Sequence, residues 1–554
     1  MPSHAITSNT LFYGDNLDIL REHVAGESVD LVYLDPPFNS SRNYNVLFRD
    51  EAGKDSESQI TAFEDTWHWG QDAERTYHEL VTEAPEHVGQ MIGAMRQFVG
   101  ANQMMAYLVM MAARLVELHR VLKPTGSLYL HCDPTASHYL KIILDTIFGA
   151  LNFRNEIIWQ RTLAKGLMSR RLPDNHDTLL CYQKGDTATW NSEAVFQPYD
   201  LANLDDKTTG KYSQRDADGR LYQLDNLINP NPDRPNLTYE FLGVTKVWRW
   251  TKDRMQAAYE AGRVIQPRPG AVPRYKRYLD EQRGKPLGDI WTDIPPLNSQ
   301  AAERLGYPTQ KPLALLERII AASSNPGNVV LDPFCGCGTT IAAAQKLGRR
   351  WIGIDLTHLS IALQRYRLEQ MYPGITFEII GEPQDIGAAR QLAQEKDGRY
   401  QFQWWALSLV RARPLGGEAG SKTGKKGADR GIDGVKTFID DATGKPKRIL
   451  IQVKSGHVNR GDIGQLRGTI EWEGATIGVF ITLEEPTHPM ITEAASAGYY
   501  HSPGWGKDYP KLQILSIAEL FAGKDIQMPP TEHGTFKQAA RIIQADGEQQ
   551  GFNL

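Results

Sequence analysis

The sequence predicts an α/β protein with a mainly parallel sheet, an inserted irregular region and a second, smaller α/β domain. Strand-like and helix-like segments alternate from residue 11 to 160 and again from 311 to 355, which is the rhythm of parallel βαβ units. That rhythm breaks between 161 and 300, and a new pair of strands follows residue 430. A chain of 554 residues is also too long for one core, so we expect two or three domains.

The composition is that of an ordinary globular protein, with 41% hydrophobic and 23% charged residues. No basic segment with an apolar run opens the chain, and no apolar stretch is long enough to span a bilayer. We therefore expect a cytoplasmic protein without membrane contact. Four cysteines show no zinc-binding pattern, and we interpret Cys335 and Cys337 as small turn residues. A net charge of −5 gives no overall nucleic-acid signal, although a basic cleft can lie in an acidic protein.

The first half of the chain is organised around Asp35. Residues 29–34 are apolar, β-branched and aromatic, which predicts a buried strand, and Pro36 and Pro37 prevent it from continuing. Asp35 is thus placed at the carboxyl end of a strand, where open α/β sheets bind ligands. A carboxylate, a rigid carbonyl and the aromatic face of Phe38 are suited to holding a flat base by its amino group. The alternative is a tight strand-to-loop turn capped by Asp35.

The neighbouring elements are predicted from periodicity and turn residues. A short strand and a helix start lie in 11–20, and residues 50–90 are polar and irregular, as in a lid or a disordered segment. The remaining elements are a long helix over 91–121 ended by 123–126, a strand over 127–132, a helix over 138–148 and a strand over 155–160.

Residues 161–300 have a different character. They contain many Asn, Asp, Pro and Arg with isolated aromatic residues, and they open on a basic run formed by Arg161, Lys165, Arg170 and Arg171. We interpret this segment as an inserted recognition region. The alternative is a loop-rich subdomain without substrate contact.

The α/β rhythm then resumes with a helix over 311–323, a strand over 328–332, a helix over 338–347 and a strand over 350–355. Gly336 and Gly338 in the turn 332–339 allow the backbone to approach a ligand at a helix N-terminus. Asp355 ends the next strand, where a ribose hydroxyl is bound in dinucleotide-type folds. A nucleotide or dinucleotide site is the alternative, but the turn lacks the G-x-G-x-x-G spacing.

These motifs resemble those of the β class of DNA amino-methyltransferases, which includes the modification subunits of type III restriction systems. The turn 332–339 (DPFCGCGT) is similar to the S-adenosylmethionine motif of that family, and residues 35–38 (DPPF) are similar to its catalytic motif. Segments 307–312 and 14–16 match two further motifs, although Tyr307 stands where many relatives carry His. The resemblance covers about residues 9–380 in the permuted order, with the catalytic motif first.

The resemblance implies a permuted Rossmann-like fold over 1–385 that transfers a methyl group from S-adenosylmethionine to double-stranded DNA. The DPPF variant is found with adenine-N6 targets more often than with cytosine-N4 targets. The target amine would donate to the Asp35 carboxylate and the Pro36 carbonyl, next to Pro37, and Phe38 would stack on the flipped base. The cofactor residues implied are Asp15, Thr309, Gln310, Lys311, Asp332, Phe334, Gly336, Gly338, Thr339 and Asp355.

The C-terminal third begins with a polar segment, 386–400, that we interpret as a linker. A helix over 402–412 and a Gly/Lys-rich loop over 415–428 follow. The loop is not a phosphate-binding loop, because Ala419 replaces the first glycine and Lys426 replaces the final Ser/Thr. We expect the domain itself to span 401–525, with a tail over 526–554.

Strands over 431–439 and 447–454 form a predicted hairpin that brings Asp433 near Gln452 and Lys454. The Asp433 carboxylate with carbonyl oxygens such as that of Val453 is a plausible Mg²⁺ site, and Lys454 can orient water or stabilise charge on phosphate. The pattern resembles the Mrr-like branch of the PD-(D/E)xK nucleases, which implies a metal-dependent DNA endonuclease. The alternative is an inert nuclease-like fold that only binds DNA.

The sequence therefore predicts a single-chain methyltransferase–nuclease that serves restriction-modification or phage defence. Two other functions stay open. One is a solitary methyltransferase with a DNA-binding C-terminal domain, and the other is a modification subunit that needs a separate restriction partner. Double-stranded DNA is the expected partner, and a homodimer is left open.

Overall fold

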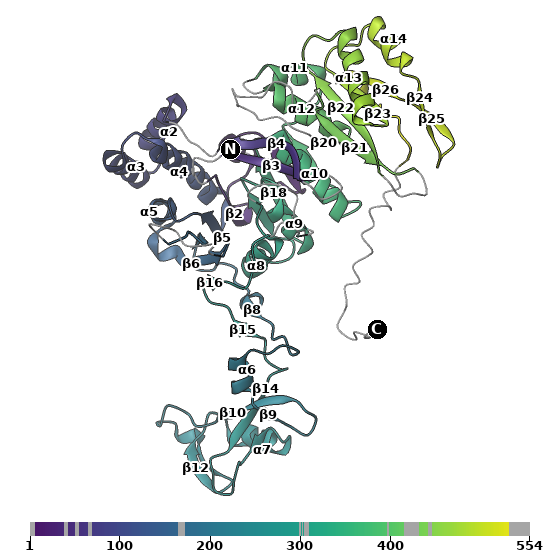
Figure 1. The fold of residues 1–554 in the computed structure, drawn as a ribbon. Helices are drawn as coiled ribbons and strands as arrows, with labels where there is room; N and C mark the ends of the chain where they lie inside the picture. The colour runs from purple at the N-terminus through teal and green to yellow at the C-terminus, as the bar shows by residue number, and fades with distance from the viewer. Residues whose placement is uncertain are drawn as a thin grey trace. The chain divides into compact units, whose positions relative to one another are not determined.

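The computed structural model describes residues 6–37, 43–49, 55–64, 69–163, 172–297, 301, 303, 310–395, 398–414, 431–440 and 446–530. The chain divides into two compact units (Figure 1). Residues 1–190 and 289–554 form the first unit, and residues 191–288 form the second.

The first unit contains a nine-stranded sheet with the order β16-β6-β7-β5-β2-β17-β18-β1-β19. β7 runs antiparallel to β5 and β6, and every other pairing in this sheet is parallel. The predicted mainly parallel α/β fold is thus confirmed. The strands are β1 (Thr10–Tyr13), β2 (Val29–Leu34), β5 (Leu122–Cys132), β6 (Phe153–Gln160), β7 (His176–Gln183), β16 (Ile290–Trp291), β17 (Val329–Asp332), β18 (Arg350–Asp355) and β19 (Glu378–Ile380).

Helices cover both faces of this sheet, which explains why every residue of β2 is buried. One face packs against α4 and α5 around Leu108 and Ile143, and the other packs against α8 and α9 around Ile319 and Ile341. The helices are α1 (Asn16–His23), α2 (Gln71–Thr82), α3 (Glu86–Val99), α4 (Gln103–Val121), α5 (Ser137–Phe148), α8 (Leu313–Ser323), α9 (Thr339–Lys346) and α10 (His358–Met371).

The helix predicted over 91–121 is wrong, because two helices occupy that range. Gly100, with φ of +82°, ends α3, and the Asn102 side chain caps α4 by accepting a hydrogen bond from the Met105 amide at 3.0 Å. The prediction of an irregular segment over 50–90 is also wrong, because α2 lies there and β4 (Asp55–Glu64) pairs antiparallel with β3 (Asn43–Arg49).

The second unit is built on a four-stranded antiparallel sheet with the order β13-β14-β10-β9. Its strands are β9 (Gln214–Arg215), β10 (Leu221–Asn226), β13 (Val264–Ile265) and β14 (Arg274–Tyr278), and α7 (Lys252–Glu260) packs beside them. A small core contains Trp248 and Met255. This compact unit, residues 191–288, spans fewer residues than the predicted region 161–300, because β7 and β16 belong to the large sheet.

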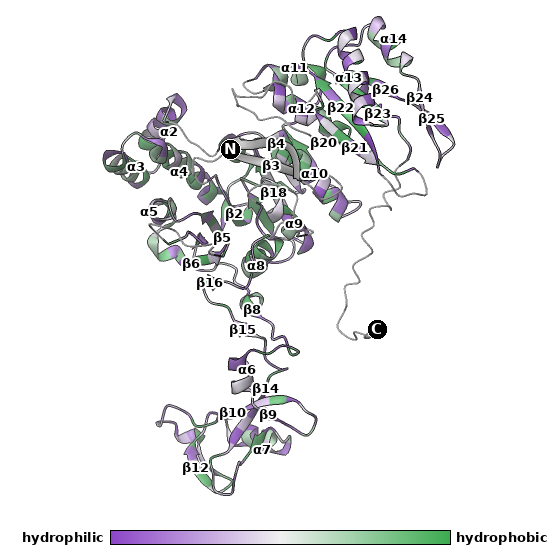
Figure 2. Ribbon diagram, in the orientation of Figure 1, coloured by the Kyte–Doolittle hydropathy of each residue, from purple (hydrophilic) through white to green (hydrophobic). Residues whose placement is uncertain are grey.

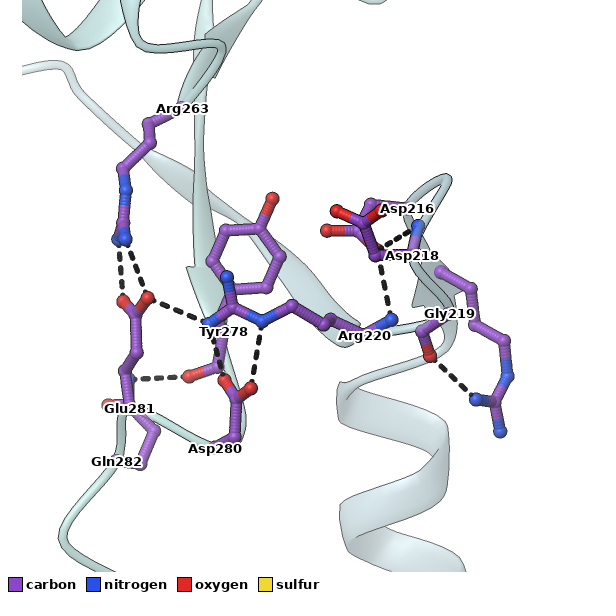
Figure 3. Close-up of polar contacts among 10 residues, drawn as sticks. Asp216, Asp218, Gly219, Arg220, Arg263, Tyr278, Asp280, Glu281 and Gln282 are labelled. Atoms are coloured by element: carbon purple, nitrogen blue, oxygen red, sulfur yellow. Dashed lines mark hydrogen bonds and ion pairs between the residues drawn. The ribbon is translucent and has the colours of Figure 1, made fainter.

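An ion-paired cluster stabilises one edge of this second unit (Figure 3). The Arg220 guanidinium lies 4.0 Å from the ring centroid of Tyr278 and donates to Asp280 and Glu281. Arg263 donates both of its terminal nitrogens to Glu281. Because these two arginines are neutralised by their partners, we interpret the cluster as a structural clamp between β10 and the segment after β14.

The C-terminal part of the first unit holds a five-stranded sheet with the order β20-β21-β22-β23-β26. Its strand β23 is mainly apolar and buried along its whole length (Figure 2). The strands are β20 (Arg413–Pro414), β21 (Gly434–Phe438), β22 (Lys447–Lys454), β23 (Ile477–Thr482) and β26 (Leu512–Ser516), with α12 (Gly398–Leu409), α13 (Arg460–Glu473) and α14 (His488–Ser496) beside them. The predicted antiparallel hairpin of β21 and β22 is present.

The predicted linker 386–400 is largely helical. It contains α11 (Ile386–Gln394) and the start of α12. Ala389 and Leu392 are buried with Trp405 in the core of the C-terminal domain. A polar composition suggested a linker here, but the spacing of these apolar residues along one helical face gives α11 a packed side. Among the described residues, no helix is long and apolar enough to cross a membrane.

Candidate functional site

A cavity of about 280 Å³ lies at the carboxyl ends of β2, β17 and β18, where the sequence places its two main motifs. Both the Asp35 segment and the turn after β17 contribute to its wall, although they are about 300 residues apart in the chain. The predicted site residues in the lining are Asp15, Asp35, Pro37, Gln310, Lys311, Asp332, Phe334, Gly336, Thr339 and Asp355.

Asp35 is ion-paired with Lys311 in this cavity. The Lys311 Nζ lies 2.5 Å from Oδ2 of Asp35, and both side chains are largely buried. A carboxylate has two acceptor oxygens, so Asp35 can accept a hydrogen bond from an amine while it is paired with the ammonium. Lys311 was predicted as a cofactor residue, and the structure places it against the carboxylate of Asp35, the residue predicted to be catalytic.

The turn after β17 is shaped by two glycines with left-handed backbones. Gly336 has φ of +47° and Gly338 has φ of +74°. A Cβ at Gly338 would lie 2.7 Å from Cγ of Gln364, whose Nε2 donates to the Gly336 carbonyl at 2.8 Å. Gly338 is the N-cap residue of α9, so the turn directs that helix N-terminus at the cavity. Glycine is therefore required at 338, because of its positive φ and because Gln364 lies so close.

A buried carboxyl group, Asp332, and a half-buried one, Asp355, flank this turn. Burial raises the pKa of Asp332 to about 7, although the Phe334 amide donates to its carboxyl. Burial likewise raises the pKa of Asp355, which accepts from the amides of Gly336 at 2.9 Å and Thr357 at 3.0 Å. Asp355 therefore fixes the glycine turn and lines the cavity with the same carboxyl group.

The loop before α1 is held by an arginine that the sequence analysis did not identify. Arg114 from α4 donates to Asp15 at 2.8 Å and is 3% exposed. It also donates to Asn16, whose Nδ2 donates to the Pro333 carbonyl at 2.7 Å. Arg114 thus couples the Asp15 loop to the Asp332 turn.

Some predicted residues fall elsewhere. Phe38 and Thr309 lie outside the described residues, and Pro36 and Gly338 are described but do not line the cavity. Residues outside the predicted motifs that line it are Tyr33, Met110, Arg114, Leu316, Thr340, Leu356 and Thr357. Their only signal in the sequence was proximity to a motif or position on a helix. The interpretation of Cys335 and Cys337 as turn residues is confirmed, since both lie in the turn between β17 and α9 and neither forms a disulfide.

The C-terminal hairpin brings the predicted nuclease residues together at its edge. Asp433 donates its amide to the Ile451 carbonyl at 2.8 Å, and its Oδ2 accepts from the Val453 amide at 2.6 Å. The register places Asp433 across from Gln452, which is 2% exposed. Lys454 ends β22 beside Thr482 of β23.

The donor set for a cation at this hairpin is limited. The described residues contain no cluster of three or more His, Cys, Asp or Glu side chains that could hold a metal ion. Asp433 supplies one carboxylate, and the remaining oxygens there would come from carbonyl groups or water, which Mg²⁺ accepts.

Comparison with known proteins identifies both parts of the chain. Residues 29–362, more than half of the chain, match the sequence profile of the N6/N4 DNA methylases. The chain belongs to the DNA methylase family. This methylase also carries a C-terminal domain, residues 399–500, that matches the restriction endonuclease profile of the Mrr catalytic domain.

Curated relatives agree with that assignment. The methylase is 28% identical over 359 residues to the type II methyltransferase M.EcaI of Enterobacter cloacae, covering 64% of this chain and 68% of the relative. It is 25% identical to the DNA adenine methyltransferase YhdJ of Escherichia coli, covering 65% and 83%. It is 23% identical to the StyLTI Mod subunit of Salmonella typhimurium, covering 61% of this chain and half of that subunit.

Two solved structures are also similar to the chain. The M1.HpyAVI–SAM complex is 16% identical, with a TM-score of 0.28, and the match covers 65% of this chain and 100% of that one. The cytosine-N4-specific PvuII DNA methyltransferase is 14% identical, with a TM-score of 0.31, and the match covers 67% and 90%.

Proposed function

We propose that the chain transfers the methyl group of S-adenosylmethionine to the N6 amine of adenine in double-stranded DNA. The observation that carries this proposal is the single cavity shared by Asp35 and the turn 332–339. A cofactor bound along Gly336 and Asp355 would present its methyl group toward Asp35. Two reactants held in one cavity gain the effective concentration that a displacement reaction needs.

The residues suit both halves of this reaction. The glycine turn and the N-terminus of α9 line the cavity, and Asp355 and Asp15 would offer carboxyl oxygens to hydroxyl groups. On the other side, the Asp35 carboxylate would accept a hydrogen bond from the target amine. That bond would favour a pyramidal nitrogen whose lone pair is available to attack, and S-adenosylmethionine would supply the electrophilic methyl group.

We propose that the recognition region is centred on residues 191–288. This unit carries sixteen Lys and Arg against thirteen Asp and Glu, in a chain whose net charge is −5. On β14, Tyr275 packs against the core, and the alternating residues Arg274 and Lys276 lie on the opposite face of the sheet. Neither forms an ion pair with a described residue, so both are available for DNA phosphates.

We further propose that the C-terminal domain cleaves DNA with Mg²⁺ held at Asp433 and Val453, assisted by Gln452 and Lys454. The hairpin geometry supports this assignment, because Asp433 and Lys454 lie at the same end of β22. With both activities in one chain, the protein would serve restriction-modification or phage defence. Methylation of the recognition site would then block cleavage.

Nucleoside analysis tests the methyl transfer. The purified chain is incubated with S-adenosylmethionine and unmethylated DNA, and the digested nucleosides are separated by mass. N6-methyladenine is the expected product. N4-methylcytosine would change only the base, whereas no methylated base would contradict the proposal.

A cleavage assay tests the coupling of the two activities. Matched substrates, unmethylated and pre-methylated by the Lys454→Ala variant, are digested in Mg²⁺ without S-adenosylmethionine or ATP. Selective cutting of unmethylated DNA is expected. Selective cutting of methylated DNA would indicate a modification-dependent nuclease, and no cutting in Mg²⁺ or Mn²⁺ would favour a DNA-binding domain or a subunit that needs a separate partner.

A further inference from the structure

Three buried polar side chains form a chain of hydrogen bonds beside the cavity. The Tyr33 hydroxyl lies 2.9 Å from Nδ1 of His131, and Nε2 of His131 lies 3.1 Å from Oδ2 of Asp177. Their exposed fractions are 2%, 0% and 2%. These three side chains do not cap a helix or close a turn. The methyl transfer proposed above does not involve them.

The sheet topology explains why they meet. β2, β5 and β7 are neighbours, and His131 lies opposite Leu179 in the antiparallel pair of β5 and β7. Because β7 runs in the reverse direction, its first residues lie at the edge where β2 and β5 end. That edge carries Asp35, two residues after Tyr33, and Tyr33 itself lines the cavity.

The electrostatic surroundings fix the role of each group. Burial alone would raise the pKa of Asp177, but the hydrogen bond and charge of His131, together with Lys311 and Arg161, hold that pKa below its usual value. Asp177 is therefore a carboxylate at neutral pH and accepts the Nε2 proton. Nδ1 is left as the acceptor for the Tyr33 hydroxyl, whose pKa burial raises, so that it stays a phenol.

Burying charged and polar groups in a core costs desolvation free energy. Replacing a buried charged pair with apolar side chains of similar volume is often neutral or stabilising. The same sheet face fills neighbouring positions with Leu179, Trp159 and Ile157. The polar chain therefore indicates a function, and its position beside the cavity that Asp35 lines suggests one.

Methyl transfer to a neutral amine leaves a proton to be removed. The nitrogen–carbon bond forms, the carbon–sulfur bond breaks, and the sulfonium becomes a neutral thioether. The positive charge passes to the amine, which must lose one proton to give the neutral methylated base.

We propose that Tyr33, His131 and Asp177 form a relay that accepts this proton. The Tyr33 oxygen takes the proton as its own proton moves to Nδ1 of His131, and the resulting imidazolium is stabilised by the Asp177 carboxylate. The charge that leaves the sulfonium thus ends on His131, and solvent later removes the proton. The other titratable groups around the relay are Asp35, Asp332, Lys311, Arg161 and Cys132.

This inference rests on the proposed methyl transfer, and the pH dependence of single-turnover rates tests it. Tyr33→Phe removes only the hydroxyl and should slow methyl transfer by about 10²-fold, with little change in S-adenosylmethionine affinity. Asp177→Asn should slow transfer and move the half-maximal rate to lower pH, because losing the carboxylate disfavours the imidazolium. Purely structural damage would not move that midpoint.

Tyr129→Phe is the matched control. Tyr129 lies on β5, is 2% exposed, and bonds the Ser323 hydroxyl at 2.7 Å on the same side of the sheet. Its loss should lower thermal stability but leave the rate and its pH midpoint unchanged.

The outcomes separate the two proposals. If the wild-type chain transfers no methyl group to DNA, the proposed function and this relay both fail. If the wild type is active and Tyr33→Phe behaves like Tyr129→Phe, the relay alone fails. Should Tyr33→Phe not fold, the Asp177→Asn midpoint decides, and an unchanged midpoint overturns the relay.

Discussion

The Lys311 ammonium lies 2.5 Å from the Asp35 carboxylate, across 276 residues of sequence. This pair joins the segment before α8 to the end of β2, and both residues line the cavity. It gives the proposed amine acceptor a fixed position and a stabilised negative charge. Any base that binds at Asp35 must be accommodated next to this ammonium.

Replacing Lys311 with methionine should reduce both stability and methyl transfer. The change leaves a largely buried carboxylate without its ion-pair partner, so we expect a loss of about 1–3 kcal/mol in unfolding free energy. The methyl-transfer rate should fall at least about 10-fold, because Asp35 is then less well positioned. Thermal melting and single-turnover rates measure the two effects.

Lys346→Met is the matched control for that variant. Lys346 pairs with Glu317 at 2.7 Å on the surface of α9, with half of its side chain exposed. Exposed pairs contribute about 0–1 kcal/mol, so little change is expected. Equal effects from the two substitutions would contradict the assigned role of Lys311.

Substituting phenylalanine for His358 should stabilise the protein, most of all in acid. The His358 imidazole is buried, stacks on Tyr13 at 3.6 Å, and has no hydrogen-bond partner for either ring nitrogen among the described residues. Burial lowers its pKa to about 3, so the unfolded chain binds a proton that the folded chain excludes as pH falls from about 6.5 to 3. The stability of the wild type should therefore decline across that window.

His358→Phe removes this linkage and retains the aromatic stacking. Melting temperatures at pH 7.5 and pH 5 should show a smaller drop for the variant than for the wild type. An equal drop in both proteins would mean that His358 is not the group responsible.

The predicted fold agrees with the structure where the sequence signal is local. β2, β17 and β18 were predicted to within one residue, because a buried parallel strand is a continuous apolar run. β7 was missed, since composition alone assigned its surroundings to the inserted region. The break between α3 and α4 is not predicted, because the apolar periodicity continues across the Gly100 stop and the Asn102 cap.

The predicted site likewise agrees with the structure where a local motif marks a residue, and not where tertiary structure brings a residue to the site. Motif residues such as Asp35, Gly336 and Asp355 converge at one sheet edge, as the strand order requires. Arg114 could not be found from sequence, because it lies within an apolar helix and its partner Asp15 is 99 residues away. The pairing of Lys311 with Asp35 likewise depends on tertiary structure.

Arg274→Ala and Lys276→Ala in the second unit should weaken DNA binding for all sequences alike. Each variant should also reduce the slope of log affinity against log salt by about 1, because one phosphate contact is lost. Fluorescence anisotropy at several salt concentrations measures both. Arg283→Ala serves as the control, since Arg283 is exposed and already paired with Glu193; an equal effect there would argue against the β14 face.

Lys454→Ala and Asp433→Asn should stop strand scission and leave methyl transfer unchanged. Lys454→Ala removes the side-chain ammonium and Asp433→Asn removes the carboxylate at the end of the β21–β22 hairpin. Arg448→Ala, at the opposite end of β22, should retain cleavage. Loss of methyl transfer in the Lys454 variant would contradict separate active sites.

The most direct test of the account is Asp35→Ala in a single-turnover methylation assay, with S-adenosylmethionine binding measured by calorimetry on the same sample. The cofactor should bind with nearly unchanged affinity, because its expected contacts lie at the turn 332–339 and at Asp355. The methyl-transfer rate should fall by about 10²-fold or more, since the acceptor that positions the amine is gone. Methylation of DNA at the wild-type rate by this variant would contradict the assignment of Asp35 and of the whole site.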